Sequence, residues 1–328
     1  MKGSIDGWGS GAIGMTIFSG SLPATRAALD GFAPLFLTGA RATLAALLAS
    51  LCLAALRQPL PGRRELPSLM IVALGVVIGF PLLTALALQH VTSAHAIVFI
   101  GLLPLSTALF GVLRGGERPR PLFWLFAGLG AAAVSGFALS QDDAASPIGD
   151  LAMIAAIVVC GLGYAEGAVL TRRLGGWQVI SWALLLSSPV MLTLSLLTWP
   201  QSAQPITAPA WLGLAYVSVF SMFIGFAFWY RGLSRGGTAS VGQLQLLQPL
   251  LGLAFASLLL HEPVSATMLG AAAIVVLSVA MARRWAGAVA RAGTVARDAA
   301  GLLDQKFNSI SSRLPAASRL PIPSATAA

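Results

Sequence analysis

Long apolar runs alternate with short polar connections along most of the chain. Ten runs of 18 to 24 residues can be marked off, and each is long enough, at about 1.5 Å per residue, to cross a hydrocarbon core of roughly 30 Å. The pattern predicts an all-α membrane protein with ten transmembrane helices. The first run is interpreted as a retained span, with a cleaved signal peptide as the alternative. The runs lie near residues 9–28, 33–56, 67–88, 93–113, 121–140, 149–170, 178–199, 209–230, 239–260 and 265–282.

The runs also repeat with a displacement of 145 or 146 residues. A Thr/Ser/Ala cluster opens both the segment 92–119 and the segment 238–263, and each segment sets a proline thirteen residues before a glutamate. Five spans per half is an odd number, so the second half enters the membrane from the opposite side and the two halves form an inverted repeat. The matching marks are Arg26 with Arg172, Gly79-Phe80 with Gly225-Phe226, Thr92 with Thr238, Pro104 with Pro249 and Glu117 with Glu262.

Basic residues gather on alternate connections. The connections after the second, fourth, sixth and eighth runs carry arginines. The intervening ones carry no Lys or Arg, and together they hold Asp30, His90, Asp142, Asp143, Asp150 and Glu262. Among twenty basic residues only Arg26 and Arg41 lie off the basic side. The positive-inside rule therefore places both termini and the even-numbered connections in the cytoplasm.

Composition narrows the classes of function. Hydrophobic residues make up 57% of the chain, charged residues 9%, and the mean hydropathy is +0.84, which indicates a lipid environment. The net charge of +9 follows the loops, so no nucleic-acid partner is predicted. Cys52 and Cys160 form no disulfide or metal pattern, and the three histidines have no metal-binding spacing. No catalytic residue, metal or cofactor is predicted, and the missing phosphate-binding loop argues against ATP-driven transport.

The polar connection 140–149 is the natural boundary between the halves. We therefore expect a first five-helix repeat at 8–140, a second at 149–282, and a basic cytoplasmic tail at 283–328. The first part of the tail fits either an amphipathic helix on an anionic leaflet or a disordered segment. Its Pro/Ser/Ala-rich end is predicted to be disordered.

Glu166 is the one carboxylate well inside a predicted span. Burying an ionised group there is costly, so such a residue normally faces a cavity or the bundle interior. A substrate or proton site is one interpretation, and pairing with a nearby arginine such as Arg172 or Arg173 is the other. Arg41, about eight residues in from the outer edge of the second run, fits either a cationic cavity wall or a side chain that reaches a carbonyl or the interface.

Three glutamines open the ninth run: Gln243, Gln245 and Gln248. They could bind a polar solute or hold helices together. His95 in the fourth run fits a packing residue somewhat better than a proton relay. Tyr164, Trp229 and Tyr230 could stack on a substrate, but Trp229 and Tyr230 fall at a predicted membrane edge, where aromatic anchors are common.

The repeated five-span unit, the arginine in GARATLAALL and the paired Pro and Glu marks resemble the EamA-type members of the drug/metabolite transporter superfamily. The resemblance covers about residues 8–282. It implies a ten-helix inverted-repeat carrier in a bacterial inner membrane, with a central cavity lined largely by the first, third, fourth, sixth, eighth and ninth helices and with the fifth and tenth peripheral. It also implies export of amino acids, other metabolites or drugs. Glu166 matches no general mark of the family.

The sequence thus favours a secondary transporter that exports a small metabolite by alternating access. Pro104 and Pro249 would weaken the helix ladder near mid-membrane and allow bending. Substrate binding is predicted at Glu166, Tyr164, Arg41, His95, Gln243, Gln245 and Gln248. Proton coupling through Glu166 and facilitated transport both remain open. An intramembrane enzyme or a non-transporting scaffold is the alternative class, and no pattern specifies the substrate or the oligomeric state.

Overall fold

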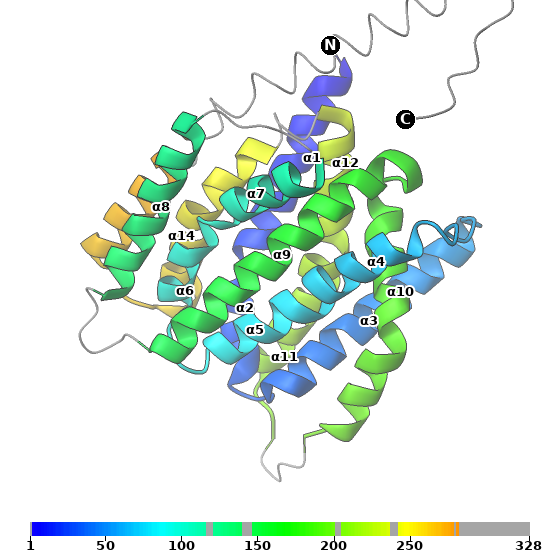
Figure 1. Ribbon diagram of the computed structural model, residues 1–328. Helices are drawn as coiled ribbons and strands as arrows, with labels where there is room; N and C mark the ends of the chain where they lie inside the picture. The colour runs from blue at the N-terminus through cyan, green and yellow to red at the C-terminus, as the bar shows by residue number, and fades with distance from the viewer. Residues whose placement is uncertain are drawn as a thin grey trace, which may run out of the picture.

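The structure is a computed structural model. In the part of the chain that it describes, it consists of ten consecutive helical units, which we call rods; some of them comprise more than one helical segment (Figure 1). The described residues are 2–115, 121–139, 146–200, 205–236, 242–278 and 280–281. Helices occur at all ten predicted runs. Six of them are long and apolar enough to cross a membrane by length and composition: Pro34–Ala55, Leu66–Ala87, Ser93–Gly111, Pro147–Thr171, Gly176–Leu197 and Ala208–Gly232.

Several rods are interrupted and therefore consist of more than one segment. The first rod is α1 (Lys2–Ser19) and α2 (Ser21–Leu29), and the fourth is α6 (Ser93–Ile100) and α7 (Leu103–Gly115). The ninth begins with the 3₁₀ segment η3 (Gly242–Leu247), which continues into α14 (Gln248–Leu260). The unbroken rods are α3 (Pro34–Ala55), α8 (Pro121–Leu139), α9 (Pro147–Leu174), α10 (Gly176–Leu197) and the last helix, Ala266–Ser278.

The third and eighth rods each contain a π-helical stretch in their middle. The third consists of α4 (Leu66–Val72), η1 (Ala73–Gly79) and α5 (Phe80–Ala87). The eighth consists of α11 (Ala208–Ala215), η2 (Tyr216–Ile224) and α12 (Gly225–Gly236). The Phe80 amide donates to the Gly75 carbonyl and the Gly225 amide to the Phe220 carbonyl, each five residues back. Such wide turns concentrate at functional sites, and here they end at the Gly-Phe pairs that mark the repeat.

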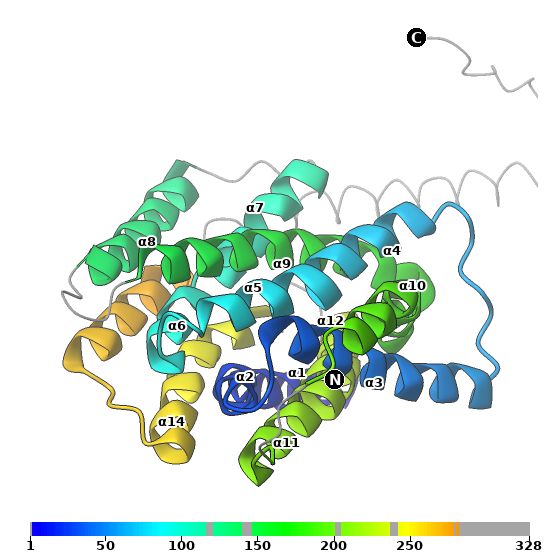
Figure 2. The ribbon, with the colours of Figure 1, turned by 90° about the horizontal axis from the view of Figure 1, so that it is seen from below.

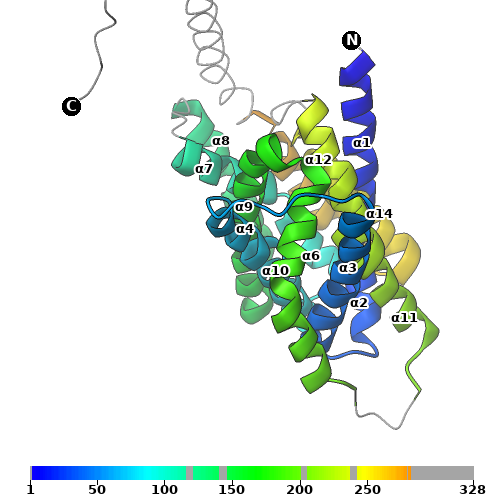
Figure 3. The ribbon, with the colours of Figure 1, turned by 90° about the vertical axis from the view of Figure 1, so that its right-hand side faces the viewer.

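Rods of the first half pack against rods of the second half in corresponding pairs. The first rod packs along the eighth (α1 with α12) and the sixth along the third (α9 with η1 and α5). Meanwhile the second packs on the seventh (α3 with α10) and the fourth on the ninth (α6 with α14), as Figure 3 shows for α1 with α12. In this set of partners each contact of one half recurs with the roles of the two halves exchanged.

Side chains are sorted as expected for a protein surrounded by lipid. Large apolar residues such as Leu47, Leu51 and Leu258 are well exposed on the outer faces of their helices. The fifth rod, α8, lies beside the last helix at one edge of the molecule (Figures 1 and 2), where Gly130 approaches Ser278. The centre of the molecule is therefore left to the other eight rods.

Connections between rods use local turn chemistry. Gly175 joins α9 to α10 as a single residue with a φ of 93°, a conformation that glycine adopts without a Cβ clash. Pro34 begins α3 after an extended Ala33, and Pro249 lies in the first turn of α14, where a missing N–H costs nothing.

Both prolines predicted as hinges follow a break: Pro104 is the second residue of α7, after the non-helical residues 101–102, and Pro249 follows the change from 3₁₀ to α geometry. The Pro104 side chain and the tail at 283–328 lie outside the described residues.

Candidate functional site

A small central cavity lies where rods of both halves meet. The space open to the centre of a water molecule is about 30 Å³, enough for about two waters. Its walls come from the first, second, third, fourth, sixth, eighth and ninth rods. The lining residues are Phe18, Ser21, Leu22, Arg41, Val76, Phe80, Pro81, Ile100, Leu103, Cys160, Tyr164, Ser221, Met222, Phe226 and Gln248.

Many of the lining positions correspond between the halves. Four pairs of wall residues stand 145 or 146 positions apart: Phe18 with Tyr164, Val76 with Met222, Phe80 with Phe226, and Leu103 with Gln248. Two of these pairs keep their apolar character, whereas Tyr164 and Gln248 replace an apolar partner with a polar one. Both halves therefore contribute corresponding positions to the frame of the cavity, but the polar side chains at two of these positions occur only in the second half.

One corner of the cavity is polar and contains a cation. Arg41 on α3 is 5% exposed, and its Nη2 donates to the Val217 carbonyl and to Ser221 Oγ on η2, both at 3.4 Å. Ser221 Oγ in turn lies 2.7 Å from Ser21 Oγ on α2. The corner thus joins three rods, and Arg41 combines both sequence interpretations, since it reaches a carbonyl and also lines the cavity.

Aromatic rings form much of the remaining wall. Phe226 makes edge contacts with Phe18, with ring centroids 4.8 Å apart, and with Tyr164 at 6.0 Å. Cys160 lies one turn before Tyr164 on the same face of α9, and Gln248 begins α14 on another wall. Such a surface suits an apolar body better than a strongly hydrated one.

Among the predicted binding residues, the cavity brings together Arg41, Tyr164 and Gln248. Glu166 is buried in α9 at 5% exposure but does not line the cavity. Gln245 is buried in η3, off the lining, and the side chain of Gln243 lies outside the described residues. The interpretation of Trp229 and Tyr230 as edge anchors was wrong: both are 1% exposed, because α12 packs them inward against α1 and α9.

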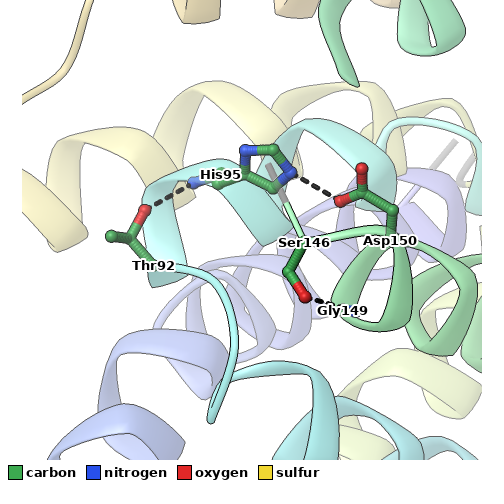
Figure 4. A network of polar contacts seen from close by, with 5 residues as sticks. All are labelled: Thr92, His95, Ser146, Gly149 and Asp150. Carbon is green, nitrogen blue, oxygen red and sulfur yellow. Dashed lines mark hydrogen bonds and ion pairs between the residues drawn. The ribbon is translucent and has the colours of Figure 1, made fainter. Parts of the chain in front are cut away.

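His95 lies at the end of the molecule where α6 begins, away from the N-terminus. Its Nε2 is 2.7 Å from Asp150 Oδ1 on α9, and its backbone amide donates to the Thr92 side chain (Figure 4). At the same end, the Glu262 carboxylate accepts hydrogen bonds from the Ser93 amide, the Ser93 hydroxyl and the Ala94 amide, at 3.2, 2.8 and 2.7 Å. We call these contacts of Glu262, His95 and Asp150 the α6 clamp, since they tie the start of α6 to the second half.

Several lining residues were missed by sequence reasoning. Ser21 and Ser221 look like ordinary helix serines, and only the fold brings them 2.7 Å apart across 200 positions. Phe80 and Phe226 were noticed as repeat marks but not as wall residues, although an aromatic residue kept in both copies was the available signal. Within the described ranges, no group of three His, Cys, Asp or Glu side chains is placed to hold a metal ion.

Comparison with known proteins gives a consistent result. The EamA-like transporter family matches residues 7–139 and again 147–284. The protein named "Uncharacterized transporter YdeK" from Bacillus subtilis (strain 168) is 63% identical over 286 residues, which are 87% of this chain and 100% of that protein. "Uncharacterized transporter YvbV" from the same strain is 24% identical over 272 residues, 79% of this chain and 85% of that protein.

A solved structure described as "Crystal structure of protein" shares the fold. Its TM-score is 0.59 at 22% identity, and the match covers 86% of this chain and 96% of that one. The two family matches account for the two halves of the cavity frame. The chain belongs to the EamA-like transporter family, within the drug/metabolite transporter superfamily, and is a multi-pass membrane transporter rather than an enzyme.

Proposed function

We propose that this transporter is a secondary carrier that exports a small metabolite from the cytoplasm by alternating access. The observation that carries the proposal is the central cavity, whose walls come in matched positions from both halves and which contains the buried cation Arg41. A site between two halves can face one side of the membrane and then the other when the halves rock against each other. The two halves would be 8–140 and 149–282, joined as an inverted repeat of ten spans in a bacterial inner membrane.

In this proposal the α6 clamp closes the outer end of the path. Glu262 lies on a connection that carries no Lys or Arg, and His95 and Asp150 lie in the first turns of the helices that follow two other such connections. By the positive-inside rule these connections are on the outer side. Pro104 and Pro249, which follow the breaks in the fourth and ninth rods, would let these rods bend as the clamp opens.

Transport is tested by counterflow in liposomes containing the purified protein, preloaded with members of a panel of amino acids, organic acids and dye-like drugs. Accumulation of at least one labelled compound above protein-free liposomes is expected. Flat traces for the whole panel, from protein shown to be inserted and folded, would refute a transport role.

Topology gives a separate prediction. A reporter fused after Asp143 is expected to lie outside the cytoplasm and one fused after Arg235 inside it, because an odd number of spans separates the two positions. Alkaline phosphatase, active only outside, and green fluorescent protein, fluorescent only inside, measure this at each site. Finding both sites on one side of the membrane would rule out the inverted arrangement.

Glu166 gives a prediction about coupling. We expect Glu166→Gln to lower transport to about a tenth of the wild-type rate or less at normal membrane abundance, because glutamine keeps the size of a buried carboxyl group but cannot ionise. The initial counterflow rate of the identified compound, normalised to protein detected by immunoblot, is the measurement. Wild-type transport in this variant would leave Glu166 a structural role only.

A further inference from the structure

The guanidinium of Arg41 has more hydrogen-bond donors than the protein uses. Arginine carries five N–H donors. Among the described residues only Nη2 donates, and both of its bonds are long, at 3.4 Å. Nε is buried and has no hydrogen-bond partner. The Nε–H donor is thus left unsatisfied in this closed conformation, and an acceptor reaches it only when the cavity opens.

The charge of Arg41 is also uncompensated. No carboxylate in the described part of the chain forms an ion pair with it, and the cavity lining contains no Asp or Glu. The charged groups of the α6 clamp differ, because Glu262 accepts three hydrogen bonds and Asp150 lies against His95. A buried cation without a counter-ion is expensive in a membrane protein and normally marks a functional site.

The residues around Arg41 form a recess with a polar corner and an apolar wall. Ser221 and Ser21 extend the polar corner as a chain of hydroxyls. Beyond them the wall becomes apolar at Phe18, Phe80 and Phe226. A solute bound here would place an anionic group against Arg41 and an apolar body against the rings.

We infer that Arg41, with Ser21 and Ser221 beside it, is the anion subsite of the carrier, and that the transported solute is a small organic monocarboxylate with an apolar body. This inference rests on the proposed transport function and specifies its substrate class. It separates the alternatives left by the sequence, because cationic drugs would meet Arg41 and no acidic residue in the described lining.

A carboxylate fits this subsite better than a phosphate group. The planar guanidinium edge pairs with both carboxylate oxygens at once. One cation balances one negative charge, whereas a phosphate monoester carries up to two, and Arg41 is the one cationic side chain within the described lining. Since the cavity has room for about two waters, a metabolite would bind a more open conformation and shift the population toward it.

The test uses the purified full-length protein in lipid nanodiscs and three probes of similar size: phenylacetate, its neutral isostere phenylacetamide, and the cation benzyltrimethylammonium. Two readouts are followed, the thermal unfolding midpoint and protection of Cys160 from maleimide in a Cys52→Ser background. Cys160 lies in the cavity wall, so its protection is a readout local to the cavity, whereas the midpoint reports the whole protein. We expect phenylacetate to raise the midpoint and protect Cys160, and the other two probes to do neither.

Arg41→Gln is expected to weaken phenylacetate protection of Cys160 by about 10- to 100-fold, the range for losing hydrogen bonds to a charged partner. Arg64→Gln removes an exposed arginine from the loop between α3 and α4 and serves as the charge-matched control, with unchanged protection expected. The comparison of probes on the protein with Arg41 intact keeps the test valid if Arg41→Gln does not fold.

Equal effects of phenylacetate and phenylacetamide, no effect of phenylacetate on the protein with Arg41 intact, or binding of benzyltrimethylammonium in its place would each overturn the inference. So would full protection by phenylacetate in a folded Arg41→Gln variant. Failure of transport is distinguishable: Arg41-dependent binding with no counterflow would refute the carrier and keep the anion site. Counterflow of neutral or cationic compounds that does not need Arg41 would keep the carrier function and refute the anion site.

Discussion

Replacing Glu262 with alanine is expected to speed the modification of Cys160 by a water-soluble maleimide about thirtyfold. Cys160 is 1% exposed in the cavity wall, so it reacts only when the cavity opens to water. The Glu262 carboxylate accepts from two amides and one hydroxyl at the start of α6. Losing these bonds costs about 2 kcal/mol, which corresponds to roughly a thirtyfold shift between clamped and open states.

The measurement is the labelling rate in nanodiscs, with Cys52 replaced by serine so that Cys160 alone reacts. Glu65→Ala is the matched control, because the Glu65 carboxylate also accepts from a backbone amide, that of Gly62, but in an exposed loop before α4. The control is expected to label at the rate of the parent protein. A Glu262→Ala rate equal to that of the control would show that the α6 clamp does not hold the cavity closed.

Gly39→Ala is expected to lower the stability of the folded protein by about 1–3 kcal/mol, the usual cost of overpacking. A Cβ on Gly39 would lie 2.7 Å from Ser195 Oγ and 2.9 Å from both the Met191 carbonyl oxygen and the Ser195 amide nitrogen. Two of these atoms belong to the backbone of α10, so a side-chain rotation cannot relieve the contact. The helices would have to separate, and α3 would carry Arg41 with it.

Unfolding of the purified protein by increasing dodecyl sulfate in mixed micelles, followed by tryptophan fluorescence, measures this change. Gly128→Ala on α8 is the control, since a Cβ there meets nothing within 4 Å and alanine favours the helix. The control should equal the parent or exceed it slightly. If the two variants unfold alike, close approach of α3 and α10 is not what requires glycine at position 39.

The positions of the ten helices were predictable because the hydrophobic run length and the membrane thickness constrain each other. The two π-helical segments were not, since an i to i−5 ladder has no apolar period of its own. For η1 a local cause, visible only in retrospect, is Pro81 in the first turn of the following α5, which has no N–H to donate to the Val77 carbonyl. In η2 the π-helical turn is accompanied by a hydrogen bond from Arg41 to the Val217 carbonyl, between residues 176 positions apart in sequence.

Part of the candidate site was also predictable, because polar side chains are rare in apolar runs. Arg41, Tyr164 and Gln248 stand out as polar or amphipathic residues in apolar runs, and all three line the cavity. Glu166 and His95 stand out equally, yet they lie elsewhere, because a single sequence does not show which face of a helix turns toward the axis of the bundle. Ser21 and Ser221 carry no signal at all until α2 and η2 are packed together.

The paired walls of the cavity also have a consequence for how such carriers diversify. A duplicated chain begins with two identical half-sites, and a change in one half leaves the matching wall of the other half in place to preserve the shape. Here Tyr164 stands at the position that corresponds to Phe18 in the first half, and Gln248 at the position that corresponds to Leu103. One substitution in one copy can therefore alter the solute that is recognised, while the second copy keeps the scaffold unchanged.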